Sequence, residues 1–221
     1  MNIEQARFNM IEQQIRPWDV LDPAVLSLLA LVRREDFVPP ALTAMAFMDT
    51  EVPLPVQGGE REFMLAPKLE ARLLQELAVH KHERVLEIGT GSGFMAALLA
   101  HKAQHVTTFE LRPELVKFAS DNLRRAGVAN VTVIQGDGAA GQPSEAPWDV
   151  IVLSGSVSQV PESLLRQLKP GGRLIAVVGE EPIMQATLFT RTDDQSFQRT
   201  VLFDTMAPRL HGFEKPSVFQ F

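Results

Sequence analysis

The sequence contains no cysteine, which excludes disulfide bonds, thiolate metal ligands and cysteine nucleophiles together and fits a reducing compartment. It has no basic excess: the formal net charge is −6, which argues against nucleic acid or an anionic membrane surface as the main partner. No run of about eighteen apolar residues could cross a bilayer, and the first residues lack the pattern of a secretory signal. We therefore expect a cytoplasmic protein with neither nucleic acid nor membrane as partner; the oligomeric state is left open.

What is present is the composition of an ordinary globular chain, with 45% hydrophobic and 22% charged residues. Its pattern changes near Pro67. Before that point, apolar residues at helical spacing predict two helices, over 3–15 and 24–32. Residues 38–59 are rich in proline and glycine, which predicts an ordered loop lying over another part of the molecule. We therefore expect residues 1–66 to form a helical and loop extension that covers the site.

Residues 67–221 alternate between helix and strand patterns, which is typical of parallel βαβ units. Two further strands near the end have only the polar segment 193–196 between them, and they predict an antiparallel hairpin. The expected fold class is therefore α/β, a doubly wound and mostly parallel sheet with an antiparallel C-terminal hairpin. The expected strands are 84–88, 105–109, 131–134, 150–153, 174–178, 185–191 and 197–203, and the expected helices 69–77, 94–101, 113–126 and 161–168.

A glycine-rich segment, Gly89-Thr90-Gly91-Ser92-Gly93, lies where the first of these strands gives way to a helix. Glycines there let the backbone approach a ligand closely, and the helix N-terminus offers free N–H groups to a carboxylate or phosphate. The spacing is G-x-G-x-G, whereas the dinucleotide fingerprint is G-x-G-x-x-G, and its third glycine is replaced by phenylalanine here. NAD is therefore the second choice of ligand. Taken alone, the segment also fits a tight turn that binds nothing.

Two acidic residues follow the neighbouring strands. Glu110 comes nineteen residues after Gly91, where a carboxylate can accept both hydroxyls of a ribose. Gly136-Asp137-Gly138 follows the next strand at the same edge of the sheet, where Asp137 can approach an adenine amino group. Each has an ordinary alternative, a solvated strand end for Glu110 and a simple turn for Asp137. Together with the glycine segment they predict a nucleoside-bearing ligand across the carboxyl ends of the strands.

This combination resembles the class I S-adenosylmethionine-dependent methyltransferases, and further segments narrow the resemblance to the protein-L-isoaspartate O-methyltransferases. The matching segments are residues 10–16, 32–39, 53–55, 86–94, 130–131, 136–138 and 146–149. The resemblance implies a Rossmann-like methyltransferase domain over 67–221, S-adenosylmethionine as cofactor, and repair of proteins by methylation of isoaspartyl carboxylates. The cofactor-binding residues that it implies are Met64, Leu65, Glu87, Gly89, Thr90, Gly91, Ser92, Gly93, Glu110, Leu111, Gly136, Asp137 and Gly138.

The chain departs from this family where the acceptor side is expected. The family has a Gly-Gln-Thr-Ile-Ser-Gln-Pro stretch whose serine lines the cofactor and the acceptor, and alignment on Pro67 places Leu65 at that serine. Arg61 could instead grip an acceptor carboxylate with two N–H groups, although a solvated loop arginine is the commoner case. The hydroxyl-rich run 154–158 replaces a Thr-Ala-Ala-like run, and the tail after Val201 lacks a Val-Pro-Leu ending. We expect intact cofactor binding and altered acceptor recognition.

Three functions are compatible with these features: isoaspartyl methylation, methylation of a different acceptor by an enzyme of the same family, and cofactor binding without catalysis. A carboxylate is already a nucleophile toward a sulfonium methyl, so the reaction needs alignment and exclusion of water rather than a strong base. The missing Ser-His-Asp set does not oppose the first function. No metal site is expected, and all five histidines are expected at the surface: His80, His82, His101, His105 and His211.

Overall fold

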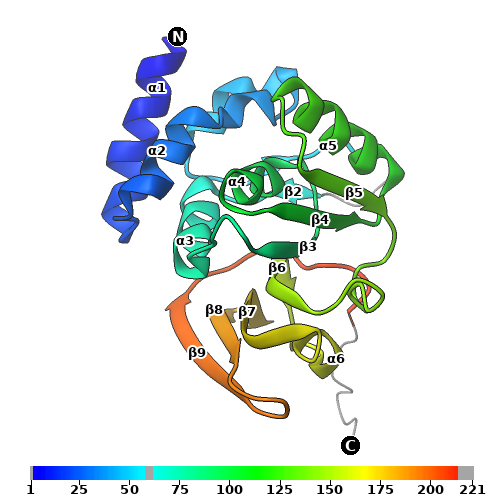
Figure 1. Cartoon of the computed structure of the whole chain (residues 1–221). Coiled ribbons are helices and arrows are strands. Elements are labelled where there is room, and N and C mark those ends of the chain that lie inside the picture. The colour runs from blue at the N-terminus through cyan, green and yellow to red at the C-terminus, as the bar shows by residue number, and fades with distance from the viewer. Residues whose placement is uncertain (1, 58–61, 214–221) are drawn as a thin grey trace, which may run out of the picture.

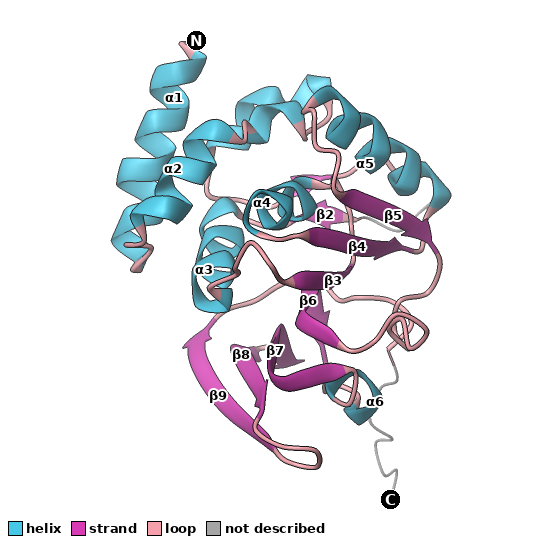
Figure 2. Cartoon of the chain, viewed as in Figure 1, coloured by secondary structure: helices cyan, strands magenta, loops and turns pink. Residues whose placement is uncertain are grey.

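The computed structural model describes residues 2–57 and 62–213, which form a seven-stranded sheet with helices on both faces (Figures 1 and 2). The α-helices are α1 (Ile3–Asn9), α2 (Pro23–Leu31), α3 (Pro67–Leu77), α4 (Phe94–Lys102), α5 (Pro113–Arg125) and α6 (Glu162–Leu165). A π-helical segment, η1 (Met10–Ile15), and three 3-10 segments, η2 (Arg16–Trp18), η3 (Arg34–Asp36) and η4 (Pro40–Phe47), complete the helical part. The strands are β1 (Val52–Pro53), β2 (Phe63–Met64), β3 (Arg84–Ile88), β4 (His105–Glu110), β5 (Val131–Gln135), β6 (Trp148–Val157), β7 (Leu168–Glu180), β8 (Ile183–Arg191) and β9 (Phe197–Asp204).

The order of strands in the sheet is β5-β4-β3-β6-β7-β8-β9. The first five of these strands pair in parallel, and β8 and β9 add two antiparallel strands at one edge. The predicted fold class and the C-terminal hairpin are therefore confirmed. The chain runs outward from β3 through β4 to β5 and then returns to β6 on the other side of β3. This reversal creates a crevice at the carboxyl ends of β3 and β6, the place where open α/β sheets bind ligands.

Successive side chains of the central strands point to opposite faces of the sheet, and each face has its own core. Val85 and Val150 belong to the larger core, which includes side chains of α2, α3 and α4. Leu86 and Ile151, one position further along each strand, belong to the smaller core with α6. Because both faces are covered, the strands are almost continuously apolar, as expected for a parallel sheet.

The N-terminal part packs on the same core as the sheet. Figure 1 shows α2 beside α3, and the larger core contains buried side chains from both sides of the 66/67 boundary. The division into an extension and a methyltransferase domain stays a prediction. Of the predicted loop 38–59 the structure describes residues 38–57, which are more regular than expected because they contain η4 and the strand β1, which pairs with β2. The helix expected over 3–15 changes from α-helix to π-helix at Met10.

The other differences from the predicted elements lie around β6 and β7. Both strands are longer than expected, and α6 ends at Leu165 although a helix to Leu168 is predicted. The helix stops early because the chain joins the sheet at once: the N–H of Trp148 donates to the carbonyl of Gln167, and Trp148 pairs with Leu168. Among the described residues, no helix combines the length and the apolar character needed to cross a membrane.

Candidate active site

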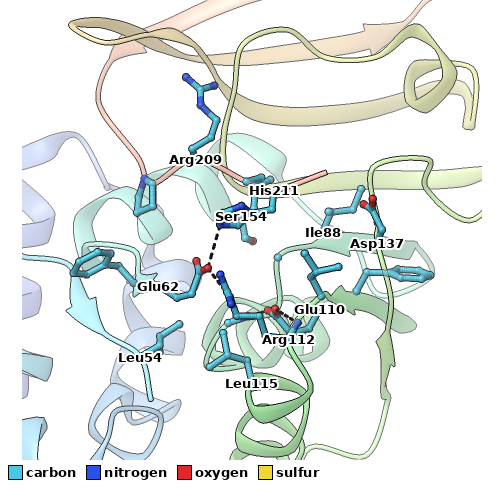
Figure 3. A pocket seen from close by; sticks show the side chains of 18 of the residues that line it. Leu54, Glu62, Ile88, Glu110, Arg112, Leu115, Asp137, Ser154, Arg209 and His211 are labelled. Carbon is cyan, nitrogen blue, oxygen red and sulfur yellow. Dashed lines mark hydrogen bonds and ion pairs between the residues drawn. The ribbon is translucent and has the colours of Figure 1, made fainter. Parts of the chain in front are cut away.

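A cavity lies at the crevice between β3 and β6, and its lining comes from three distant parts of the chain (Figure 3). The loops after β3, β4 and β5 form what we call the cofactor side. This side is lined by Ile88, Gly89, Gly91, Phe109, Glu110, Leu111, Arg112, Leu115, Gly136, Asp137 and Gly138. The sequence-predicted residues Gly89, Gly91, Glu110, Leu111 and 136–138 are therefore brought together as expected.

The glycine segment has a backbone that only glycine adopts readily. Gly89, Gly91 and Gly93 have φ angles of +94°, +54° and +84°, in the left-handed region where a side chain is strained. The N–H groups of Gly89 and Thr90 both donate to the carbonyl of Phe109, at 2.9 and 3.1 Å, which fixes the segment to the end of β4. Gly93 does not line the cavity. It precedes α4, and a Cβ there would lie 3.3 Å from the Ala119 side chain, so its smallness serves the packing of α4 on α5.

Glu110 points into the cavity from the end of β4. One carboxyl oxygen accepts from the N–H of Gly91 at 2.9 Å and the other from the N–H of Arg112 at 3.0 Å. Burial raises the pKa of the carboxyl above its usual value, and these N–H donors oppose the rise. Each oxygen keeps a lone pair for a hydroxyl donor. The Asp137 carboxylate accepts from the N–H of Ala139 at 2.9 Å and is exposed at the far end of the same side.

Glu87 lies behind the cofactor side rather than on its surface. It is fully buried in β3, and its two oxygens lie 2.7 Å from the hydroxyls of Ser154 and Thr108. Burial raises the pKa of Glu87 to about 8, against the effect of the two hydroxyl contacts. Thr108 also lies 2.7 Å from the hydroxyl of Thr90. Glu87 therefore reaches the cavity only through Ser154, which is part of the lining.

A second, smaller cavity adjoins the glycine segment on the other side. Its lining residues are Phe63, Met64, Leu65, Glu70, Gly89, Thr90, Gly91, Ser92, Met95 and Ser154. The predicted residues Met64, Leu65, Thr90 and Ser92 thus meet here, and Gly89, Gly91 and Ser154 belong to both cavities. Arg61, the other predicted acceptor residue, lies outside the described residues. We call the segment 62–66, Ser154 and the residues 207–211 the acceptor side.

The loop that carries Leu65 is held from behind by a buried ion pair. The Arg34 guanidinium donates to the carbonyl oxygen of Leu65 at 2.6 Å and forms an ion pair with Glu70. Both side chains are almost completely buried. Burial raises the pKa of Glu70 to about 7, and the neighbouring guanidinium of Arg34 opposes that rise. The position of the Leu65 backbone therefore depends on a contact that the sequence pattern did not indicate.

The segment 207–211 closes the cavity. It runs from β9 across the sheet toward the loop after β5 and joins β6 through two backbone hydrogen bonds at Ser156, of 2.7 and 2.9 Å. Leu210 fills the space above Gly89 and Gly155, where a Cβ on either glycine would lie 2.8 Å from the leucine side chain. The His211 ring nitrogen lies 3.1 Å from the Glu62 carboxylate, which also accepts from Arg112 at 2.7 Å (Figure 3).

Two features of this closure are absent from the sequence-based expectations. His211 is expected only as a surface residue; it is half exposed, but it also lines the cavity and contacts Glu62. The free volume of the main cavity is about 80 Å³. This is less than the 300–1,000 Å³ that is usual for small-molecule sites, because segment 207–211 occupies part of the crevice.

Within residues 2–57 and 62–213, no three His, Asp or Glu side chains form a group that could bind a metal ion.

Comparison with known proteins agrees with this geometry. A structure of a protein-L-isoaspartate O-methyltransferase superposes with a TM-score of 0.79 at 27% identity, covering 93% of this chain and 66% of that one. A second structure, described as a putative protein-L-isoaspartate O-methyltransferase from Plasmodium falciparum in complex with S-adenosyl-L-homocysteine, has a TM-score of 0.74 at 21% identity. It covers 91% of this chain and 96% of that one, and at this identity it shows the fold alone.

Two curated relatives extend the comparison to sequence. The protein-L-isoaspartate O-methyltransferase of Methanoculleus marisnigri is 43% identical over 78% of this chain and 77% of its own length. That of Rhodopseudomonas palustris is 38% identical over 93% of both chains. The model of the family described as protein-L-isoaspartate(D-aspartate) O-methyltransferase matches residues 5–207. The chain belongs to the protein-L-isoaspartate(D-aspartate) O-methyltransferase family.

Proposed function

We propose that this protein is an S-adenosylmethionine-dependent methyltransferase that methylates the carboxylate of isoaspartyl residues in peptides or proteins. The observation that carries the proposal is the convergence of Gly89, Gly91, Glu110 and Asp137 on one cavity at the switch point of the sheet, in a chain of this family. A cytoplasmic location and the repair of damaged proteins belong to the same proposal.

The residues of the cofactor side fit an adenosyl group. Glu110 has lone pairs that can accept two ribose hydroxyls, and Asp137 can accept the adenine amino group. The side chains of Ile88 and Phe109 also line the cavity, and together they offer apolar surface on which the adenine base can pack. S-adenosylmethionine would supply an electrophilic methyl group on a sulfonium sulfur. Because segment 207–211 leaves little free volume, we expect it to move outward when the cofactor binds.

The chain's own contribution to the reaction is alignment and protection from water. The carboxylate oxygen of the acceptor forms the bond to the methyl carbon, and the electron pair of the broken carbon–sulfur bond remains on sulfur. No residue has to remove a proton, because the carboxylate is already ionised at neutral pH. The apolar side chains of Met64 and Leu65 line the smaller cavity and would exclude water from the point of transfer.

One observation favours a second candidate, methylation of a different acceptor by the same enzyme. Leu65 stands where the family's serine is expected, and its side chain lines the smaller cavity. A hydroxyl that could bind the acceptor is thus missing from the segment 62–66. The cofactor side is unaffected by this change, so both candidates require the same cofactor.

Methyl transfer to defined peptides tests the proposal. Wild-type protein and labelled S-adenosylmethionine are incubated with an isoaspartyl peptide and with the same peptide containing ordinary aspartate. We expect label only on the isoaspartyl peptide. Absence of transfer by protein that binds S-adenosylhomocysteine would contradict it. Label on fresh and aged cell extracts then separates the candidates, because isoaspartyl methylation rises with ageing and methylation of another acceptor does not.

A further inference from the structure

Ser154 lies at the junction of the two cavities. It is near the carboxyl end of β6, and its Cβ is 3.7 Å from the place a Cβ would occupy on Gly89. It lines both the main cavity, with Glu110 and Asp137, and the smaller cavity, with Leu65. A side chain in this position can contact an acceptor group at the end of a ligand that spans the two cavities.

The other hydroxyls of the smaller cavity are less suited to this contact. Its described lining contains three of them, on Thr90, Ser92 and Ser154. Thr90 and Ser92 are buried, at 4% and 3% exposure, and their oxygens lie within hydrogen-bond distance of Thr108 and of the Phe94 N–H. Ser154 is the more accessible of the three. Segment 62–66 contributes only the apolar side chains of Phe63, Met64 and Leu65 to this cavity.

Behind Ser154 runs a line of hydroxyl and carboxyl groups through the sheet. Thr90, Thr108, Glu87 and Ser154 are linked by three contacts of 2.7 Å each. If Thr90 donates to Thr108 and Thr108 donates to one Glu87 oxygen, the proton of a neutral Glu87 sits on the other oxygen and donates to Ser154. The Ser154 hydrogen is then free to point into the cavity. An ionised Glu87 instead accepts that hydrogen, and Ser154 has none left for a ligand.

We propose that Ser154 binds the acceptor carboxylate by donating a hydrogen bond from the β6 side of the cavity, taking over the role of the serine that is absent at Leu65. Glu87 acts through Ser154 as a positioning residue that directs the hydroxyl hydrogen. This inference rests on the proposed function, because it concerns the same methyl transfer. It explains how a chain with leucine at position 65 can still recognise a carboxylate.

The arrangement makes recognition depend on pH. Burial raises the pKa of Glu87 to about 8, and the carboxyls of Glu70 on α3 and Glu110 on β4 add to the rise. The hydroxyls of Thr108 and Ser154 oppose it, and Arg34 faces Glu70 on its far side. Glu87 is therefore neutral at pH 7 and ionised at pH 9. Carboxylate binding by Ser154 is present at pH 7 and is lost as the pH rises through about 8.

The test compares the Ser154→Ala variant with wild type across pH 6–9.5, with isoaspartyl peptide and saturating S-adenosylmethionine. At pH 7 we expect kcat/KM for the peptide to fall about 10- to 100-fold, the effect of losing one hydrogen bond to a charged group. The ratio of wild-type to variant rates should approach one above pH 9. We use the ratio because the α-amino group of the cofactor also titrates, near about 7.7–8.0, and changes the rates of both proteins equally. This change cancels in the ratio.

Calorimetry provides a readout apart from turnover. Binding of S-adenosylhomocysteine should be unchanged in the Ser154→Ala variant, whereas the affinity of the isoaspartyl peptide for the S-adenosylhomocysteine complex should fall by a similar factor. Ser156→Ala is the matched control, since Ser156 is buried two residues further along β6 and its hydroxyl has no hydrogen-bond partner among the described residues. It should behave as wild type. Addition of Leu65→Ser to Ser154→Ala should restore part of the lost activity by returning a hydroxyl from the loop.

Two results would overturn the inference in different ways. If wild type methylates the isoaspartyl peptide and Ser154→Ala keeps the wild-type rate and pH profile, Ser154 does not bind the acceptor and only this inference fails. If wild type binds S-adenosylhomocysteine but methylates no isoaspartyl peptide, the proposed function fails, and the inference that rests on it fails as well.

Discussion

The cofactor side and the acceptor side of the cavity are held in place by different kinds of contact. On the cofactor side the important groups belong largely to the backbone. The N–H groups of Gly89 and Thr90 bind the carbonyl of Phe109, and the N–H of Gly91 binds Glu110. These contacts follow from the path of the chain, so most side-chain substitutions nearby leave them intact.

On the acceptor side the contacts are made by side chains from distant segments. Arg34 binds the Leu65 carbonyl across 31 residues, Ser154 contacts Glu87 across 67, and His211 contacts Glu62 across 149. A single substitution can remove any of these contacts without disturbing the glycine segment. Substitutions in one half of the site can therefore alter its contacts while the backbone contacts of the other half stay in place.

The largest effect is expected on the acceptor side, where removal of the Arg34 side chain should lower the stability of the protein. Arg34→Met leaves the Glu70 carboxyl buried without its ion-pair partner, so we expect the free energy of unfolding to drop by about 3–5 kcal/mol. Urea denaturation measures this. Arg33→Met is the control, because Arg33 is 58% exposed and its ion pair with Asp36 contributes at most about 1 kcal/mol. A loss below about 1 kcal/mol in Arg34→Met would show that the buried pair does not hold the loop.

The corresponding change on the cofactor side is Glu110→Ala. It removes the carboxylate that we propose accepts two ribose hydroxyls and releases the Gly91 and Arg112 N–H groups, so we expect the Kd for S-adenosylhomocysteine to rise at least about 100-fold. Isothermal titration calorimetry measures the Kd, with the surface variant Asp121→Ala as control. Unchanged affinity would mean that the nucleoside does not lie against β4.

Leu65→Ser should have a smaller effect, and it should raise activity rather than lower it. The new hydroxyl adds a donor for the acceptor carboxylate, so we expect kcat/KM for an isoaspartyl peptide to increase about 3- to 10-fold, with unchanged Kd for S-adenosylhomocysteine. Leu65→Ala creates the same space without a hydroxyl and should not gain activity. Equal gains in both variants would assign the effect to space alone.

The smallest effect is expected for His211→Ala. The contact between His211 and Glu62 is partly exposed, so it contributes at most about 1 kcal/mol to closure of segment 207–211. We expect S-adenosylhomocysteine to associate about two- to threefold faster with the variant, measured by stopped-flow fluorescence. His82→Ala is the control, because His82 is exposed and lies far from His211 in the sequence. Slower association would indicate that His211 helps the ligand to bind.

The cofactor side could be predicted from the sequence because it depends on local order. Parallel strands carry the residues that follow them to one edge of the sheet, so Glu110 and Asp137 were expected beside the glycine segment, and both line one cavity with Gly89 and Gly91. Gly93 and Glu87 show the limit of this reasoning. Both belong to the same motif, yet one serves helix packing and the other lies behind the surface.

The acceptor side could be predicted only in part, because its contacts join segments that no local pattern relates. Glu70 occupies a polar position on a predicted helix but is buried against Arg34, which only the packing of η3 on α3 reveals. The predicted helix over 161–168 is present but ends early, at Leu165, for a similar reason, since pairing of Leu168 with Trp148 outweighs local helix preference. His211 was expected only at the surface because nothing in its neighbourhood indicated Glu62.

Segment 207–211 makes two backbone hydrogen bonds to the sheet, both at Ser156, and Arg209 adds side-chain contacts with Gly179 and Glu180 of β7, whereas neighbouring strands share many more backbone bonds. Regions with few such bonds open at a much lower free energy than the whole protein unfolds. The segment can therefore detach and rejoin while β3 and β6 keep their pairing. Exchange of cofactor and product then requires local opening only, and a bound nucleoside that holds the segment outward would speed hydrogen exchange at the Leu210 amide, which donates to Ser156, while the central strands keep their protection.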